Sequence, residues 1–348
     1  MLSSTEPSWS AVEMQIVSPI SKVEETAALI ENGADELFFG VIPEEWTRRY
    51  GRFTANRRSA NNLGSLAEVE KVIEIVKAEG KRTSVALNGT THTVEQINFV
   101  SELAKELAGL GVDALIVGDV QLLSLIGALN LPVRLHVSST ASCRNIATAR
   151  FFQKLGADRI ILPRHVSLWE IDVMATGFPE MEFEAFVLND GCPYEEGLCH
   201  TLHLPNQMGG PLCFEQFGLE TGRRDGGPLS PEDCERIDHN DTCYDRWRWS
   251  NFSRGFTTTP SGHPYGPCGL CAIPALKESG IEHIKIAGRD GNTTRKIRSL
   301  EMVRGITSRL ENDDCQEKIT TYAKNLRGQP ELCGNKDMCY YSESFSDY

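Results

Sequence analysis

The sequence lacks any long hydrophobic run. No stretch approaches the ~18 consecutive apolar residues that a membrane-spanning helix needs, and the polar segment 1–10 has neither the basic stretch nor the apolar core of a secretory signal. Basic residues are also scarce, because 35 Lys and Arg stand against 48 Asp and Glu, a net charge of −13. We therefore expect a cytoplasmic protein that does not enter membranes and does not bind nucleic acid non-specifically.

Cysteine is nearly absent from the first half of the chain. Of the 11 cysteines only Cys143 precedes residue 190, and all the others lie from Cys192 to Cys339. A disulfide framework is uncommon in a large cytosolic protein, whereas clustered thiols in a reducing compartment indicate metal or redox chemistry. Scattered free thiols are the simpler alternative.

Strand and helix patterns alternate along the 348 residues. The predicted strands are apolar on both faces, as in a parallel sheet, and they span 13–20, 36–41, 82–89, 114–119, 132–139, 159–164, 182–189 and 283–289. The helical patterns that follow them span 22–33, 65–80, 93–111, 121–129, 144–156, 167–176, 271–280 and 294–310. Eight such units predict a (β/α)8 TIM-like barrel, and an open doubly wound sheet is the alternative.

The domain organisation follows from where this alternation stops. Residues 11–310 form the predicted barrel, and they include a Cys-rich insertion, 190–270, after the seventh strand. Residues 311–348 read as a polar C-terminal tail. In both candidate folds the active site lies at the carboxyl ends of the strands, and the insertion leaves the seventh strand at that end.

The insertion carries the thiols that indicate a metal site. Cys192, Cys199 and Cys213 follow the seventh strand, and Cys268 and Cys271 form a CxxC that opens the helix 271–280. The free N–H groups and positive dipole of a helix N-terminus lower a thiol pKa, which suits thiolate ligands. Four thiolates can hold zinc or an iron–sulfur cluster. The irregular spacing, with a single CxxC, favours a cluster over structural zinc.

Two segments resemble the landmarks of the collagenase-like peptidase family, U32. They are EFEAFVLNDGCPYEEGLCH at 182–200 and CGLCAIPALKESGIEHIKIAGRD at 268–290. Upstream, GADELFFGV, GVDALIVGDV, LHVSSTASCRN and GADRIILPRHVSLWEI are also similar to the barrel of that family. The resemblance covers about residues 13–310.

The resemblance implies a barrel that carries a 4Fe-4S cluster on four cysteines. Matched one by one, the ligands are Cys192, Cys199, Cys213 and Cys271, with Cys243 and Cys268 as alternates. The implied activity is oxygen-independent hydroxylation of quinone precursors or RNA bases, although other members are described as collagenases. One departure is Lys285-Ile286-Ala287-Gly288-Arg289, which lacks the glutamate of the family's eighth strand.

The tail cysteines fall outside this resemblance. Cys315, Cys333 and Cys339, with a spare cysteine of the insertion, could hold a second cluster. Plain thiols are the alternative for this group.

Polar residues near the carboxyl ends of the strands are the candidate catalytic groups. Arg164 and Arg289 are the strongest, because an arginine at a barrel mouth is too costly to bury unless it has a carboxylate, phosphate or substrate partner. His136 is either a third catalytic residue or a hydrogen-bonded histidine of the core.

Three functions remain open from the sequence. The first is an iron–sulfur enzyme that hydroxylates or otherwise modifies an aromatic small molecule or an RNA base, with an electron donor or partner protein. The second is a collagenase-like peptidase or hydrolase, although the chain has no HExxH helix and no GxSxG elbow. The third is a non-catalytic iron–sulfur subunit of a complex.

Overall fold

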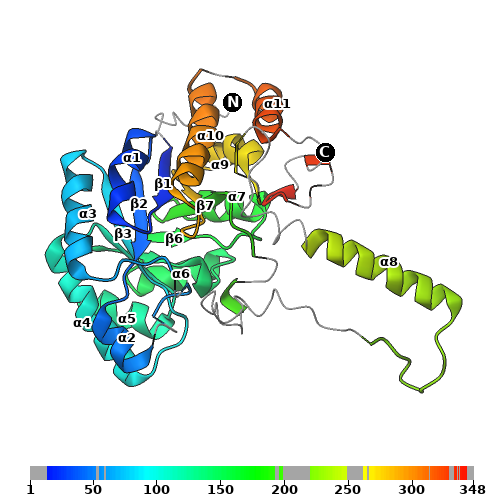
Figure 1. Cartoon of the computed structure of the whole chain (residues 1–348), viewed down its shortest axis with the longest axis horizontal. Coiled ribbons are helices and arrows are strands. Elements are labelled where there is room, and N and C mark those ends of the chain that lie inside the picture. Colours follow the sequence, from blue (N-terminus) through cyan, green and yellow to red (C-terminus); the bar gives the residue numbers. More distant parts are fainter. Residues whose placement is uncertain are drawn as a thin grey trace, which may run out of the picture.

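A closed parallel barrel forms the body of the protein (Figure 1). The computed structural model describes residues 14–51, 55–58, 60–192, 196–198, 220–248, 262–264, 266–312, 314–328, 333–334, 336 and 338–342. The strands are β1 Gln15–Pro19, β2 Glu36–Gly40, β3 Arg82–Leu87, β4 Ala114–Val117, β5 Arg134–Val137, β6 Arg159–Ile161, β7 Glu182–Leu188 and β8 His283–Ile286. Each pairs with the next in the chain, and β8 pairs with β1. The predicted (β/α)8 barrel is confirmed, and the open sheet is wrong.

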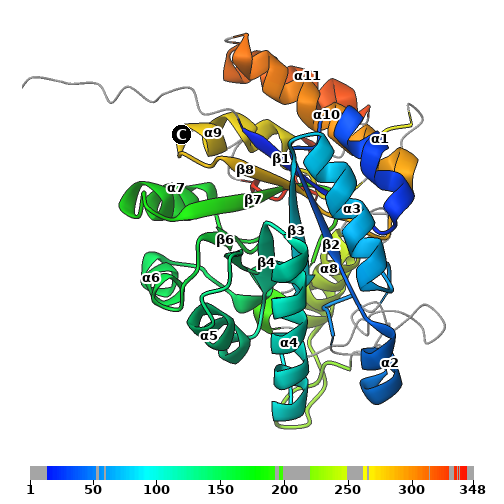
Figure 2. The same ribbon diagram turned by 90° about the vertical axis from the view of Figure 1, so that its left-hand side faces the viewer.

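Helices surround the strands on the outside (Figure 2). Those of the barrel are α1 Thr26–Glu31, α3 Leu66–Ala78, α4 Val94–Leu110, α5 Val120–Ala128, α6 Ile146–Lys154, α7 Leu168–Gly177, α9 Ile273–Glu278 and α10 Thr293–Glu311. Their starts follow the predicted capping chemistry. Ser65 caps α3 by accepting from the Glu68 N–H, and Ser167 and Glu170 form a capping box on α7.

Three further helices lie where no helix was predicted. They are α2 Glu44–Tyr50 after β2, α8 Pro231–Arg248 in the insertion, and α11 Gln316–Arg327 in the tail. Helix α8 extends away from the barrel (Figure 1) and has no apolar stripe to reveal it in the sequence. Helix α11 does have such a stripe, since Ile319, Tyr322, Ala323 and Leu326 lie three or four residues apart and pack on the core.

The interior of the barrel is built in layers. Because side chains alternate along a strand, residues two apart point to the same side. Apolar interior side chains from most strands form one cluster, namely Val17, Phe38, Ala86, Ile116, Ile161, Phe186 and Ala287. We call this set the apolar layer. A second, polar layer lies two residues closer to the start of each strand and includes Glu36, Arg159, Glu184 and Lys285. The strands end at the mouth of the barrel, so the apolar layer lies between the polar layer and the mouth.

Candidate active site at the barrel mouth

The polar layer is an ion-pair network in the centre of the barrel. Arg159 Nη1 donates to Glu36 Oε2 at 2.8 Å and to Glu184 Oε2 at 3.0 Å, and its Nε donates to Glu182 at 3.1 Å. Lys285 pairs with Glu184 and lies 3.8 Å from the centroid of the Phe38 ring. Each buried carboxylate thus has a cation, which is the condition under which buried charges are tolerated.

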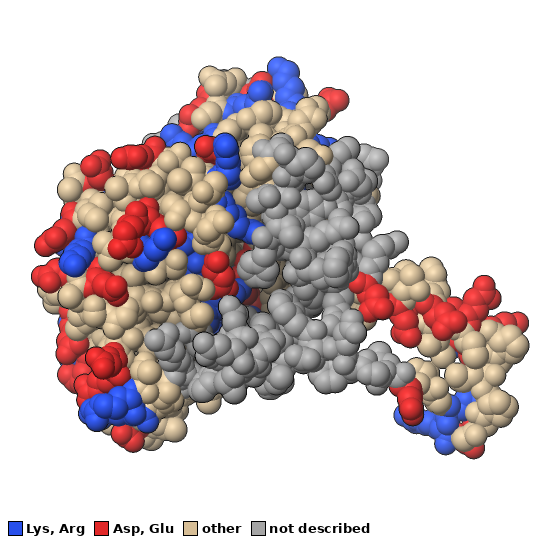
Figure 3. All heavy atoms as spheres, viewed as in Figure 1, with Lys and Arg blue, Asp and Glu red and all other residues tan. Residues whose placement is uncertain are grey.

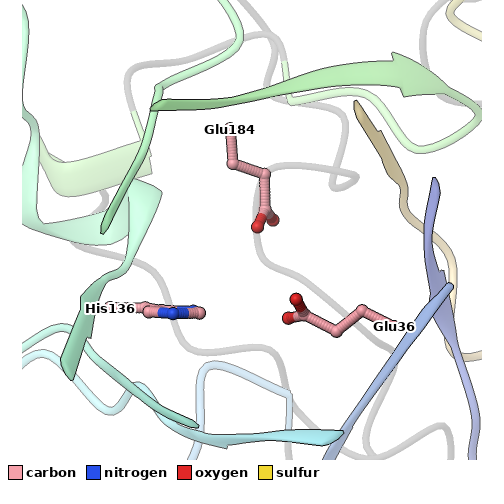
Figure 4. A group of neighbouring side chains, drawn as sticks. All are labelled: Glu36, His136 and Glu184. Carbon is pink, nitrogen blue, oxygen red and sulfur yellow. The ribbon is translucent and has the colours of Figure 1, made fainter. Parts of the chain in front are cut away.

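The polar layer also contains His136, one of the three candidate catalytic residues. Its ring points at Glu36 and Glu184 inside the barrel (Figure 4), and neither ring nitrogen has a hydrogen-bond partner among the residues that the structure describes. Burial, together with the positive charge of Arg159, lowers the pKa of His136 well below 6.5. The structure thus places a neutral His136 beneath the apolar layer and away from the mouth.

His136, Glu36 and Glu184 present ligand atoms within 4.8 Å of one another, as a metal site would. The network argues against a metal there. Arg159 already binds both carboxylates, and Lys285 binds Glu184 as well. A divalent cation would have to displace these two positive charges. We therefore assign this trio to barrel structure.

Above the apolar layer, arginines gather at the mouth. We call the set formed by Arg57, Arg58, Arg164 and Arg289 the mouth arginines. Arg58 bridges Asp190 and Asp290, the residues that follow β7 and β8. Sequence reasoning missed Arg57 and Arg58 as site residues, which are two of the five arginines in the segment 43–64 after β2. The length and Arg-rich composition of that segment were the only available signal.

Arg164 lies as predicted at the mouth, and it has protein partners there. Its Nε donates to the Asp190 carbonyl at 2.7 Å, and its guanidinium pairs with Glu196. The same group lies 3.8 Å from the centroid of the Phe186 ring in the apolar layer. Arg164 therefore has a fixed orientation directly above the floor of the site.

Arg289 differs from the other mouth arginines in its partners. It is 5% exposed, and its Nη1 donates to Asn62 Oδ1 at 2.7 Å. Within the described part of the chain no carboxylate forms an ion pair with it. Burial, reinforced by the neighbouring Arg58 charge, lowers the pKa of Arg289 to about 10. A buried guanidinium of this kind is a ready partner for an anionic ligand.

Glycine at the end of β2 allows this arrangement. A Cβ atom at Gly40 would collide with Asn62 Oδ1 and Arg289 Nη1, and would lie 2.7 Å from Asn56 Nδ2. The absence of a side chain at Gly40 therefore lets Asn62 and Arg289 meet over the strand end.

The first predicted cluster ligand lies among the mouth arginines. Cys192 Sγ accepts a hydrogen bond from Arg57 Nη2 at 3.7 Å, and the same arginine donates through Nη1 to the Glu196 carbonyl at 3.1 Å. Cys199 and Cys213 lie outside the described residues. The alternate Cys243 lies on α8, where its Sγ is 3.6 Å from His239 Nε2.

The fourth predicted ligand, Cys271, lies in a different group. It lines a pocket together with Cys268, Cys333 and Cys339. Burial and these neighbouring thiols raise the pKa of Cys271, and likewise raise that of Cys339 to about 12. The pKa lowering expected for Cys271 at a helix start is therefore wrong, because burial among thiols outweighs the helix dipole.

Cys315, the third tail cysteine of the predicted second cluster, is absent from that pocket. It is the N-cap residue of α11 and is exposed.

Comparison with known proteins decides the family. The model of peptidase family U32 matches residues 21–343, nearly the whole chain. The chain belongs to peptidase family U32. The matched range extends the resemblance seen in the sequence to α11 and the tail.

Curated members of the U32 family are similar to parts of this chain. The tRNA hydroxylation protein P of Escherichia coli (strain K12) is 30% identical over 185 residues, which are 53% of this chain and 38% of that protein. The tRNA hydroxylation protein P2 of Bacillus subtilis (strain 168) is 28% identical over 276 residues, 78% of either chain. A collagenase of Porphyromonas gingivalis is 23% identical over 249 residues, 65% of this chain and 56% of that protein. The matches thus cover well under two thirds of the Escherichia coli and Porphyromonas gingivalis proteins.

The surface of this U32 protein reflects its net negative charge. On the face shown in Figure 3, acidic side chains are spread over the barrel helices and along α8, and basic side chains lie among them. Of the helices that the structure describes, none is both long and apolar enough to cross a membrane.

Proposed function

We propose that this protein is an iron–sulfur enzyme that hydroxylates a base of tRNA without molecular oxygen. The observation that carries the proposal is Arg289, which is buried at the mouth with an amide as its hydrogen-bond partner and with no carboxylate paired to it among the described residues. A nucleotide supplies the missing anion as a phosphate, and an arginine is well suited to bind it.

The relatives support RNA as the substrate class. Two of the proteins that match this chain are named tRNA hydroxylation proteins, and the Bacillus subtilis one matches over 78% of its own length. The net charge of −13 argues against unspecific binding to RNA, so recognition depends on local positive groups. The mouth arginines supply these groups at the end of the barrel where the loops carry the chemistry.

The cysteines support a cluster as the redox group. By resemblance its ligands are Cys192, Cys199, Cys213 and Cys271, with Cys243 and Cys268 as alternates. The position of Cys192 fits, because it lies at the mouth, where Arg57 donates a hydrogen bond to its Sγ. A bound 4Fe-4S cluster would supply one-electron transfer at the mouth. The two electrons that hydroxylation removes from the base would pass to a reducible oxygen-atom donor or, through a partner protein, to an electron acceptor.

The protein's own residues would bind and orient the base. Arg289 would hold a phosphate, while Arg58 stays fixed by Asp190 and Asp290. Arg164 lies over Phe186, so a flat ring at the mouth would meet a guanidinium plane and an apolar floor. The same floor keeps water from below out of the site.

Nucleoside mass spectrometry of tRNA tests the proposal. Hydroxylation is a two-electron oxidation of the base, so anaerobically prepared protein is incubated with unmodified tRNA and either a reducible oxygen-atom donor or water with an electron acceptor. The digested nucleosides are then searched for a gain of one oxygen atom. Arg289→Gln removes the phosphate partner and should lower product at least ~100-fold, as for loss of one charge-stabilising group. Arg298→Gln is the matched control, because Arg298 is exposed on α10 and pairs with Glu301.

A collagen substrate provides the opposing outcome. Cleavage of denatured collagen by the same preparation, with no oxygen added to any nucleoside, would refute hydroxylation in favour of the hydrolase alternative. Equal product from Arg289→Gln and wild type would refute the phosphate-binding role.

A further inference from the structure

Four cysteines from two distant parts of the chain meet at one pocket beside the mouth. Cys268 and Cys271 come from the segment that precedes α9, and Cys333 and Cys339 come from the tail. The thiol of Cys271 lies close enough to the other three thiols to interact with them electrostatically. We call these four the tail-site cysteines. No disulfide joins any of them.

Backbone pairing brings the two segments together. Cys268 and Cys339 face each other in a parallel bridge. The Cys268 N–H donates to the Met338 carbonyl at 2.7 Å, and the Tyr340 N–H donates to the Cys268 carbonyl at 3.0 Å. Cys268 also bridges Leu188 at the end of β7. The tail is thus attached to the barrel at the cysteines themselves.

Helix α11 and the last described residues fix the same contact. Gln316 Nε2 donates to the Cys271 carbonyl at 2.9 Å, and Arg327 Nη2 donates to the Gly266 carbonyl at 2.7 Å. The Tyr341 hydroxyl donates to the Phe186 carbonyl at 3.0 Å, and its ring lies against Gly269, where a Cβ would be 3.0 Å from Cε2. These bonds hold the pocket in place on both sides of the cysteines.

We propose that the tail-site cysteines bind a second 4Fe-4S cluster, separate from the one at the mouth. Four cysteine thiols that line one pocket, with Cys271 buried and the other three half-buried, are a donor set that a 4Fe-4S cluster or zinc can take. The separation of the sulfur atoms selects the cluster. The only described trio of metal-binding side chains within 4.8 Å of one another is Glu36, His136 and Glu184, so no three tail-site sulfurs are that close.

A single zinc ion does not suit this separation. With Zn–S bonds of about 2.3 Å, tetrahedral zinc holds its sulfur atoms about 3.8 Å apart. In a 4Fe-4S cluster each cysteine binds a different iron, so the ligands stand farther apart. The charge of the pocket agrees, since Arg327 lines it beside the four cysteines.

The second site changes the ligand set of the first. If Cys271 belongs to the tail site, Cys192, Cys199 and Cys213 need a fourth ligand from elsewhere, and Cys243 on α8 is the candidate already named. The two sites are also connected. The Tyr340 hydroxyl, next to Cys339, donates to the Asp190 carbonyl at 2.6 Å, two residues before Cys192.

Metal analysis of anaerobically purified full-length protein tests the second cluster. Wild type should contain about eight irons and eight sulfides per chain, as two 4Fe-4S clusters require. The double variant Cys333→Ser/Cys339→Ser should lose half of both and keep the mouth cluster. Cys192→Ser/Cys199→Ser should lose the other half. Cys234→Ser/Cys315→Ser, at two exposed cysteines, should lose none.

The single variant Cys271→Ser assigns the shared residue. It should match Cys333→Ser/Cys339→Ser in iron content and in its electron paramagnetic resonance spectrum after reduction. If it instead matches Cys192→Ser/Cys199→Ser, Cys271 belongs to the mouth and the tail site is refuted.

Thiol alkylation of wild type covers the case in which a variant fails to fold. In the native protein Cys333 and Cys339 should react with iodoacetamide at least ~tenfold more slowly than Cys234 and Cys315, and removal of iron should raise their rates while leaving those of the exposed pair unchanged. Equal rates, four irons that all depend on Cys192, or one zinc that depends on Cys339 would each overturn the second cluster. Absence of tRNA hydroxylation with all eight irons present would refute only the proposed function.

Discussion

Two arginines of this barrel are nearly equally buried and have opposite surroundings. Arg159, in the polar layer, is 1% exposed and pairs with Glu36, Glu182 and Glu184, whereas Arg289, at the mouth, is 5% exposed and bonds to Asn62. Burial alone lowers an arginine pKa, but the carboxylates around Arg159 more than offset it and raise the pKa. For Arg289 burial prevails.

The two arginines show the difference between a buried charge that stabilises the barrel and a buried charge that is available to a ligand. In the polar layer every buried carboxylate that was described has a cation beside it, and the apolar layer closes it off from the mouth. At the mouth, Arg58 and Arg164 form ion pairs with carboxylates. Arg289 has no ion-pair partner among the described residues, so its guanidinium can still bind an anion. A buried charge without an ion-pair partner lowers the stability of the folded protein, and a bound anionic ligand offsets this loss.

The largest effect should come from breaking the paired arginine. Arg159→Met leaves Glu36 without its ion-pair partner and should lower the free energy of unfolding by about 3–5 kcal/mol. Urea unfolding measures it. Arg289→Met removes an uncompensated charge, so its free energy of unfolding should equal or exceed that of wild type. Similar losses in both variants would contradict the distinction between the two arginines.

A smaller effect should come from crowding the mouth. Gly40→Ala places a methyl group against Asn62 and Arg289 and should cost about 1–3 kcal/mol of stability by overpacking. It should also lower tRNA product, because Arg289 is displaced. Gly109→Ala in α4 is the control, since no atom lies within 4 Å of its Cβ. That variant should gain about 0.5–1 kcal/mol. Unchanged stability and activity in Gly40→Ala would show that Asn62 and Arg289 can move aside without loss.

The smallest effect should appear as a pH slope from the polar layer. In the folded state the pKa of His136 is well below its ordinary value of 6.5. At a pH between the folded-state pKa and 6.5, the unfolded chain therefore binds more protons than the folded one. Stability from this group is therefore complete above pH 6.5 and falls as the pH drops, by up to about 1.4 kcal/mol per pH unit. Chemical unfolding at pH 7.5, 6.5 and 5.5 measures the slope, and His136→Leu should flatten it. An equal slope in the variant would place the titrating group elsewhere.

At lower pH, the dependence of stability on pH comes from a carboxylate of the same layer. Burial would raise the pKa of Glu36, but Arg159 and the Ser84 hydrogen bond outweigh it and lower the pKa below 4.5. Its stabilising effect is present above pH 4.5 and is lost as the pH falls further. This lower range keeps it distinct from His136.

Local patterns predicted most of the fold. Strand β7 ends in the apolar run 185–188, and α7 begins at a Ser167–Glu170 capping box, as expected from neighbours along the chain. Helix α8 could not be predicted in this way, because its residues are polar all round. Arg164 and Arg289 were placed correctly at the mouth, since their position at strand ends follows from the order of the elements.

The sequence by itself determined the barrel, the family and the number of thiols. Strand and helix periods, caps and short motifs are local, so they can be read without knowing which parts of the chain meet. Only the tertiary structure decided which arginine is paired and which cysteines share a pocket. Cys271 and Cys339 meet because β7, the 266–272 segment and the tail pair through their backbones. Arg289 bonds to Asn62, with no carboxylate paired to it among the described residues, because the loop after β2 returns to the strand end, where Leu63 pairs with Gly40 and Val41. Such pairings join residues far apart in sequence, and no local pattern encodes them.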